Sequence, residues 1–149
     1  MSLEEQARSN FDSGYNCAES VLLVVSSKSR ASRRGADRYV PRIATGFGGG
    51  MARNGDICGA LIGGVMAISL AMGRDRPEES RDACYNAVDR FYNEFAKTFG
   101  SCKCRDLTKV DLKTSTGIEA YRSRIHSERC VPIAAWAARR AHEIIRESQ

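Results

Sequence analysis

The sequence lacks the residue spacings that mark several common classes of catalytic and binding site. Its only two histidines, His126 and His142, form no HExxH pattern, which excludes the zinc-peptidase arrangement of paired helical histidines. The absence of a CxxC pair argues against a thioredoxin-type dithiol. The glycines of residues 46–50 lack the spacing of a P-loop or of a dinucleotide fingerprint, so nucleotide binding is not expected.

Extended charged and apolar runs are also scarce. The formal net charge is +5, but no dense basic run with interleaved aromatics is present, so we expect no nucleic-acid partner. The N-terminal residues include acidic side chains and no apolar signal-peptide core, which predicts a cytoplasmic protein. Residues 57–73 are apolar, yet glycines dilute them and charges flank them closely, so we expect a buried helix and no membrane span.

Helical patterns dominate what is present. They predict one all-α domain over residues 1–149, a compact bundle of about five to seven helices around a glycine-rich central helix. The Val/Leu run at 21–25 has β character, but no partner strand bounded by turns accompanies it. The expected helices cover Leu3 to Asp12, Asn16 to about Ser26, Asp37 to Thr45, Asp56 to Gly73, Asp75 to Phe99, Ile118 to Ile125 and Cys130 to Glu147.

Local signals support several of these boundaries. Asn16 and Glu19 have the spacing of a capping box, and Gly100 is a helix stop. Asp75 and Pro77 suit the first turn of a helix. The Ser/Arg-rich stretch 26–34 and residues 107–117 are expected to form loops or short turns.

The six cysteines carry the main chemical signal. In a cytoplasmic protein they indicate metal binding or redox chemistry rather than structural disulfides. A helix N-terminus stabilises a thiolate and lowers the pKa of a cysteine there. If the helix starts converge, they would form a site for an anionic metal–thiolate cluster or for reactive thiols; the alternative is that these cysteines fill apolar space. The cysteines at or near predicted helix starts are Cys17, Cys58, Cys104 and Cys130.

The remaining candidates have weaker signals. Cys84 lies on the apolar stripe of its helix and is expected to pack in the core. Cys102, two residues before Cys104, could be a further metal ligand, a resolving thiol or a residue without a role. His126 could be a ligand or base near Cys130, or a surface histidine. The glycines of residues 46–50 could form a positive-φ turn or direct backbone N–H groups at an anion or at cluster sulfurs.

Three segments and one late cysteine together resemble a known family. They are GYNCAESVL at 14–22, GFGGGMARNGDICGALIGG at 46–64, FGSCKCRDLTKVDL at 99–112, and Cys130. In this order they resemble the C_GCAxxG_C_C family, the CGAxxG four-cysteine redox-active proteins, over nearly the whole chain.

The resemblance implies a site and a setting. It assigns the hallmark cysteines to the same four positions found at helix starts, and matches the CGAxxG element to Cys58, Gly59, Ala60 and Gly63. Cys84 and Cys102 fall outside the pattern. Family members are small bacterial and archaeal proteins, often encoded beside transporter genes. A similar module in split-Soret cytochromes implies an iron–sulfur centre, but this chain has no CxxCH for c-type haem.

Three functions follow as hypotheses. The first is an iron–sulfur cluster, most simply a two-iron one, held by Cys17, Cys58, Cys104 and Cys130 for electron transfer with an unidentified redox partner protein or for redox sensing. The second is a metal-free thiol/disulfide oxidoreductase or switch, in which a low-pKa Cys58 attacks and another of the four resolves. The third is a structural zinc site or a metal-binding accessory of a transporter. The chain's size and helix packing suggest a homodimer.

Overall fold

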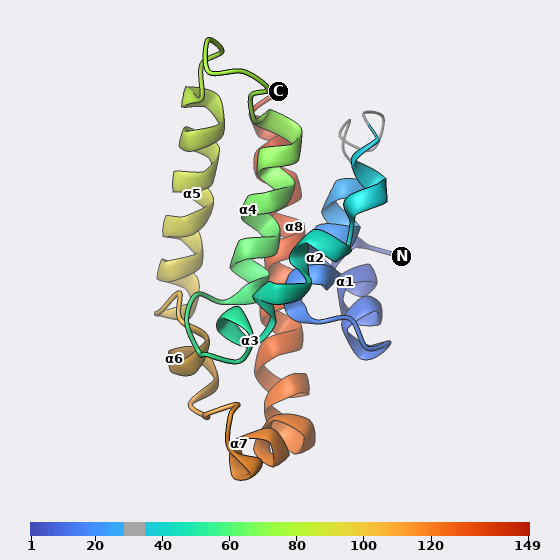
Figure 1. Ribbon diagram of the computed structural model, residues 1–149, viewed down its shortest axis with the longest axis vertical. Helices are drawn as coiled ribbons and strands as arrows, with labels where there is room; N and C mark the ends of the chain where they lie inside the picture. The colour runs from blue at the N-terminus through green and yellow to red at the C-terminus, as the bar shows by residue number, and fades with distance from the viewer. Residues whose placement is uncertain (29–34) are drawn as a thin grey trace.

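The structure, a computed structural model, describes residues 1–28 and 35–149 and is all-α, as predicted (Figure 1). No β-strand occurs in these ranges, which contain only an isolated antiparallel bridge between Ile57 and Lys103. The α-helices are α1 (Leu3–Asp12), α2 (Cys17–Ser27), α3 (Gly48–Met51), α4 (Gly59–Met72), α5 (Asp82–Phe99), α6 (Cys104–Thr108), α7 (Ser115–Ala120) and α8 (Val131–Glu147). Two 3₁₀ segments, Ala36–Tyr39 and Arg42–Phe47, and a π-helical segment, Tyr121–Cys130, complete the described chain.

Helix α4 is the centre of the domain, packed against α2, α5 and α8. In Figure 1 it runs between α5 and α2, with α8 behind it. Its glycines allow this close packing: a Cβ at Gly63 would lie 2.6 Å from the Ala18 carbonyl oxygen, and one at Gly64 would lie 2.4 Å from the Phe91 ring. Residues 57–73, predicted to be a buried helix, thus mostly form the central helix. Among the described residues, no helix combines the length and apolar character that a membrane span requires.

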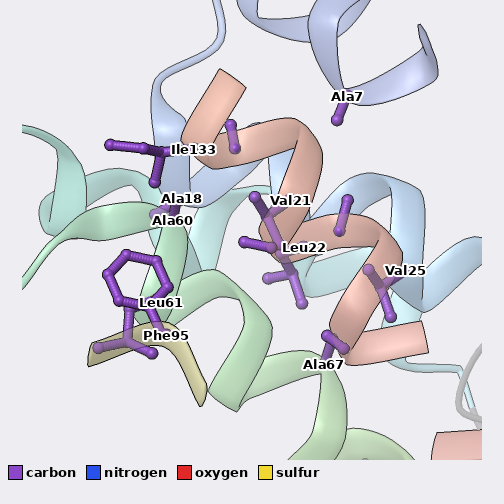
Figure 2. Packing of buried hydrophobic residues seen from close by; sticks show 14 of the residues in the cluster. Ala7, Ala18, Val21, Leu22, Val25, Ala60, Leu61, Ala67, Phe95 and Ile133 are labelled. Carbon is purple, nitrogen blue, oxygen red and sulfur yellow. The ribbon is translucent and has the colours of Figure 1, made fainter. Parts of the chain in front are cut away.

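The buried side chains between these helices form one hydrophobic core (Figure 2). Ala18, Val21, Leu22 and Val25 of α2 are fully buried, and their spacing of three and four residues is that of one helix face. Each valine or leucine side chain contributes roughly 1.5–3 kcal/mol when it leaves water. The core therefore outweighs the modest β preference of valine in this segment.

Capping boxes define the starts of α1 and α2. In α2 the Asn16 side chain accepts the Glu19 N–H at 2.9 Å, and the Glu19 carboxylate accepts the Asn16 N–H at 2.8 Å. Ser2 and Glu5 form the equivalent pair in α1. The predicted cap at Asn16 is confirmed, and it places Cys17 in the first turn of α2.

Several predicted boundaries differ from the structure. The helix expected from Asp75 begins at Asp82, because residues 75–81 form turns that include an N–H···O bond from Glu79 to Arg76. The central helix begins at Gly59, because the preceding residues pair with the 102–104 segment. Residues 37–45 form 3₁₀ turns, and the expected 107–117 loop contains parts of α6 and α7. In the predicted 26–34 loop, residues 29–34 lie outside the described ranges.

The main difference between the predicted and observed helices lies in the last third of the chain. The predicted break before Cys130 is absent, since α7, the π-helical segment and α8 follow one another without a gap. Cys130 is the last π-helical residue, and Pro132 lies in the first turn of α8. Proline lacks the N–H needed for a regular helical hydrogen bond, and we attribute the wide turns before it to this missing donor. The predicted last helix, Cys130 to Glu147, matches α8 with Cys130 as its N-cap, but the segment before it is also helical, so Cys130 lies inside a helical rod.

Candidate four-cysteine site

Four cysteines from four separate segments come together beside the starts of α2 and α4. Cys17 is the first residue of α2, Cys58 caps α4, Cys104 starts α6, and Cys130 ends the π-helical segment. Their charges interact: Cys17 raises the pKa of each of the other three, and Cys104 raises the pKa of Cys58 and of Cys130. The structure thus assembles the residues that the sequence singled out.

Cys58 and Cys104, which we call the inner pair, are held together by the backbone. The Cys58 N–H donates to the Cys102 carbonyl at 2.8 Å, and the Cys104 N–H donates to the Asp56 carbonyl at 2.7 Å. These bonds flank the Ile57–Lys103 bridge. Both side chains are buried, each with 8% of its surface exposed. The inner pair therefore has a backbone frame that does not depend on any disulfide or metal.

Cys17 and Cys130, which we call the cavity pair, are partly exposed and lie on helices. Both line a half-open cavity of about 460 Å³, a size typical of small-molecule sites. Neither member of the inner pair lines it. The four cysteines therefore divide into two buried anchors and two that a small molecule could approach.

A left-handed turn lies against the inner pair and Cys17. Residues 49–53 all have positive φ, with values of 67° at Gly49, 68° at Gly50, 71° at Met51, 49° at Ala52 and 69° at Arg53. This conformation costs roughly 1–2 kcal/mol at each non-glycine residue. Hydrogen bonds from Ala52 N–H to Gly46, from Gly55 N–H to Gly49 and from Asp56 N–H to Gly50 hold it. The predicted positive-φ glycine turn is confirmed, but its continuation through residues 51–53 carries no sequence signal.

The turn and α4 both bring backbone close to sulfur. A Cβ at Gly50 would lie 2.6 Å from the Cys104 Cβ, and a Cβ at Gly59 would lie 2.4 Å from the Cys17 sulfur. The backbone N–H groups of Gly49 and Ala60 hydrogen-bond to the Cys17 thiol and lower its pKa. The glycines next to Cys58 and in the turn are thus needed for the approach of the other cysteines.

The expectation of low thiol pKa values is wrong for the metal-free protein. Burial raises the pKa of the Cys104 thiol to about 11 and that of Cys130 to about 12, and repulsion from neighbouring thiolates adds to the shift. Burial also raises the pKa of Cys17 and, to a greater extent, that of Cys58. Helix-start N–H groups act in the opposite direction, but removal from water outweighs them.

The four thiols are donors that both zinc and iron–sulfur centres use. Four thiols, backbone N–H donors and glycine cradles are the groups that a negatively charged iron–sulfur cluster requires. In the described part of the chain, no three His, Cys, Asp or Glu side chains are grouped so as to hold one metal ion. The four sulfurs are therefore not arranged around one point in the described residues.

Tyr121 belongs to this site, although no motif identifies it. It starts the π-helical segment and lines the cavity beside Cys17 and Cys130. Burial, together with the charges of Cys130, Cys17 and Cys104, raises the pKa of its hydroxyl far above the ordinary value. π-Helical turns are frequent at functional sites, but their sequence gives no recognisable pattern.

His126, Cys84 and Cys102 have other surroundings. The His126 ring packs edge-on against Phe11 and Tyr121, with centroid distances of 4.5 and 5.6 Å. Cys84 is buried on α5 with its sulfur 3.8 Å from the Ser69 hydroxyl, in agreement with a packing role. The Cys102 carbonyl supports Cys58, while its thiol hydrogen-bonds with the Tyr92 hydroxyl.

Comparisons with known proteins agree with the cysteine pattern. Residues 15–144 match the family profile described as "Putative redox-active protein (C_GCAxxG_C_C)". A protein of Archaeoglobus fulgidus, described as "Uncharacterized protein", is 33% identical over 106 residues, which cover 65% of this chain and 68% of the relative. No solved structure matches the chain.

Proposed function

Because the chain belongs to the C_GCAxxG_C_C family of redox-active proteins, we propose that its four family cysteines hold an iron–sulfur cluster for electron transfer or redox sensing. The ligands in this proposal are Cys17, Cys58, Cys104 and Cys130. When bound, such a cluster supplies reversible one-electron chemistry. The electron partner would be another protein.

One observation carries the proposal: two buried and two partly exposed family thiols lie close enough for the charge of one to raise the pKa of another. As free thiolates they would repel one another in a medium that also solvates them poorly. A coordinated metal removes this penalty, because its positive charge deprotonates the thiols outright.

The chain's own residues would hold the thiolates in two ways. The backbone bonds around Ile57 and Lys103 position the inner pair. The N–H groups of Gly49 and Ala60 direct partial positive charge at the Cys17 sulfur. Hydrogen bonds to ligating sulfur stabilise the charged form and tune the reduction potential.

The metal-free thiol/disulfide function is the second candidate, and the cavity favours it. Cys17 and Cys130 line a space that a substrate can enter, so they are better placed for exchange than Cys58, the nucleophile expected from the sequence. Their raised pKa values oppose it, since the thiolate is the reactive species. A zinc-binding role as an accessory of a transporter stays a third proposal.

The test is to purify the protein without oxygen and to measure iron, zinc and acid-labile sulfide per chain together with the visible spectrum. The set consists of wild type, four single Cys→Ser variants of the family cysteines, and Cys84→Ser as a buried control outside the site. We expect iron with matching sulfide in wild type and Cys84→Ser, and loss of both in the four site variants.

Other outcomes separate the alternatives. Zinc without sulfide would replace the cluster by a zinc site. Metal-free protein that also fails reconstitution, with site thiols that oxidise reversibly to a disulfide, would establish the thiol/disulfide function. Full iron retention in Cys58→Ser would contradict the proposed ligand set.

A further inference from the structure

The charged side chains that line the cavity beside Cys17 and Cys130 are all positive. The described residues that line it include two arginines, Arg53 and Arg122, and no aspartate or glutamate. Both arginines are exposed, so they lie at the opening of the cavity. Arg53 is the last residue of the left-handed turn, and Arg122 follows Tyr121 in the π-helical segment. The positive charge at the cavity therefore comes from the left-handed turn and from the π-helical segment.

Neither Arg53 nor Arg122 has an acidic partner in the described part of the chain. Arg139 and Arg140, by contrast, pair with Glu143. Arg105, close in space to the turn, pairs with Asp111 at 2.9 Å. The Arg53 and Arg122 guanidinium groups thus keep their donors available to a ligand, and a planar guanidinium matches a carboxylate or another oxyanion.

The other polar side chains of the cavity are already engaged. The Asn16 amide donates to the Thr45 carbonyl at 2.9 Å, and the Thr45 hydroxyl donates to the Glu19 carboxylate at 2.6 Å. The Thr108 hydroxyl donates to the Cys104 carbonyl at 2.8 Å. The Tyr121 hydroxyl has no such partner among the described residues. The groups left to recognise a ligand are therefore donors, which selects for an anion.

The size and remaining walls of the cavity point to an organic ligand. A volume of about 460 Å³ equals roughly fifteen waters at about 30 Å³ each. An inorganic oxyanion would leave most of it empty. Phe11, Leu112 and Ile118 supply apolar surface. A ligand with an anionic end and an apolar body could contact the arginines with the first and the apolar side chains with the second.

We propose that this cavity is the substrate chamber of the site and binds a small organic anion, with its carboxylate or equivalent oxyanion held by Arg53, Arg122 and the Tyr121 hydroxyl. Its apolar body lies against Phe11, Leu112 and Ile118, beside the cavity pair. As a substrate chamber the inference rests on the proposed redox function, whereas anion binding itself can be measured independently.

The experiment is calorimetric titration of the anaerobically purified protein, and of the same protein after reconstitution, with benzoate and with benzamide. These probes share shape and apolar body but differ in charge. Sulfate serves as the inorganic anion. We expect benzoate to bind at least ten-fold more tightly than benzamide and more tightly than sulfate. Arg53→Gln and Arg122→Gln should each weaken benzoate binding at least five-fold, while Arg8→Gln, an exposed arginine on α1, should leave it unchanged.

Equal binding of benzoate and benzamide would overturn the proposal, as would absence of benzoate binding in both protein preparations. Tighter binding of sulfate would overturn the organic-anion assignment. Tyr121→Phe guards against misfolding of the arginine variants: it should weaken benzoate binding with an unchanged helical circular dichroism spectrum. Iron and sulfide are measured on the same samples. If the protein loads iron but neither preparation binds benzoate, this inference alone is refuted; if the protein stays iron-free after reconstitution and binds benzoate, the cluster alone is refuted.

Discussion

The inner pair and the cavity pair lie in one site but are positioned by different means. Cys58 and Cys104 are held by backbone hydrogen bonds between two short segments, whereas Cys17 and Cys130 depend on the placement of helices. The inner pair is buried, and the cavity pair borders open space. In the function that we propose, the inner pair anchors the cluster, and the cavity pair forms the side of the site that borders the cavity.

The largest effect is expected where the two pairs meet, at Gly59. Gly59→Ala would place a methyl group 2.4 Å from the Cys17 sulfur and 2.8 Å from the Phe47 carbonyl oxygen. We expect a loss of about 1–3 kcal/mol in unfolding free energy from overpacking, together with loss of bound metal. Denaturant unfolding and metal analysis measure the two effects.

Two other glycines provide matched controls for Gly59. Gly46→Ala adds a methyl group with nothing within 4 Å and should change stability by less than about 0.5 kcal/mol. Gly64→Ala meets the Phe91 ring at 2.4 Å and should destabilise the protein without touching a thiol. If Gly64→Ala lost metal as completely as Gly59→Ala, metal loss would follow from general destabilisation, and the contact of Gly59 with Cys17 would not be its cause.

In the metal-free protein, the rate of thiol alkylation should distinguish the cavity pair from the inner pair. At pH 8 the thiolate fraction is lowered about 100-fold for Cys104, with a pKa of about 11, and about 1,000-fold for Cys130, with a pKa of about 12, so thiolate fraction does not separate the pairs and access must. A bulky maleimide should label Cys17 and Cys130 before Cys58 and Cys104, because only the cavity pair borders open space. Peptide mass spectrometry of timed samples measures the order, and earlier labelling of the inner pair would contradict the division.

Alkaline pH should weaken the metal-free fold through the same thiols. Folding raises the pKa of Cys104 from 9.0 to about 11, so the protonated thiol stabilises the folded state. This contribution is complete below pH 9 and is lost as the pH rises towards 11. We expect the melting temperature to fall over this range, with a shallower fall in Cys104→Ala than in Cys84→Ala. If the melting temperature falls equally steeply with pH in both variants, Cys104 does not contribute to the loss of stability at alkaline pH.

The smallest effect is expected at Thr108, which supports only the inner pair. Its single hydroxyl proton is donated to the Cys104 carbonyl at 2.8 Å while the thiol is protonated, and when the hydroxyl turns to donate to the sulfur it stabilises the thiolate and lowers the pKa of Cys104. Thr108→Val should cost about 1 kcal/mol and raise the pKa of Cys104 further. Urea unfolding and thiol titration measure the changes, with Thr45→Val as a cavity-lining control. An unchanged pKa of Cys104 would show that the hydroxyl does not act on the thiol.

The sequence alone determined the features that local chemistry controls. The all-α class, the Asn16–Glu19 capping box, the stop at Gly100 and the packing role of Cys84 all follow from patterns within one helix. Family motifs and helix-start positions also identified the four cysteines. These inferences succeeded because caps, breakers and apolar periodicity act over a few residues.

Only the tertiary structure decided how the four cysteines are held and how acidic they are. The π-helical segment that carries Cys130 and Tyr121, the left-handed turn through Arg53, and the pairing of residues 56–58 with 102–104 have no signal within their own segments. Burial then reversed the expected direction of the thiol pKa shifts, because at Cys17 and Cys58 removal from water outweighs the helix-start N–H groups. Burial is a property of the packed chain, so no local pattern could reveal it.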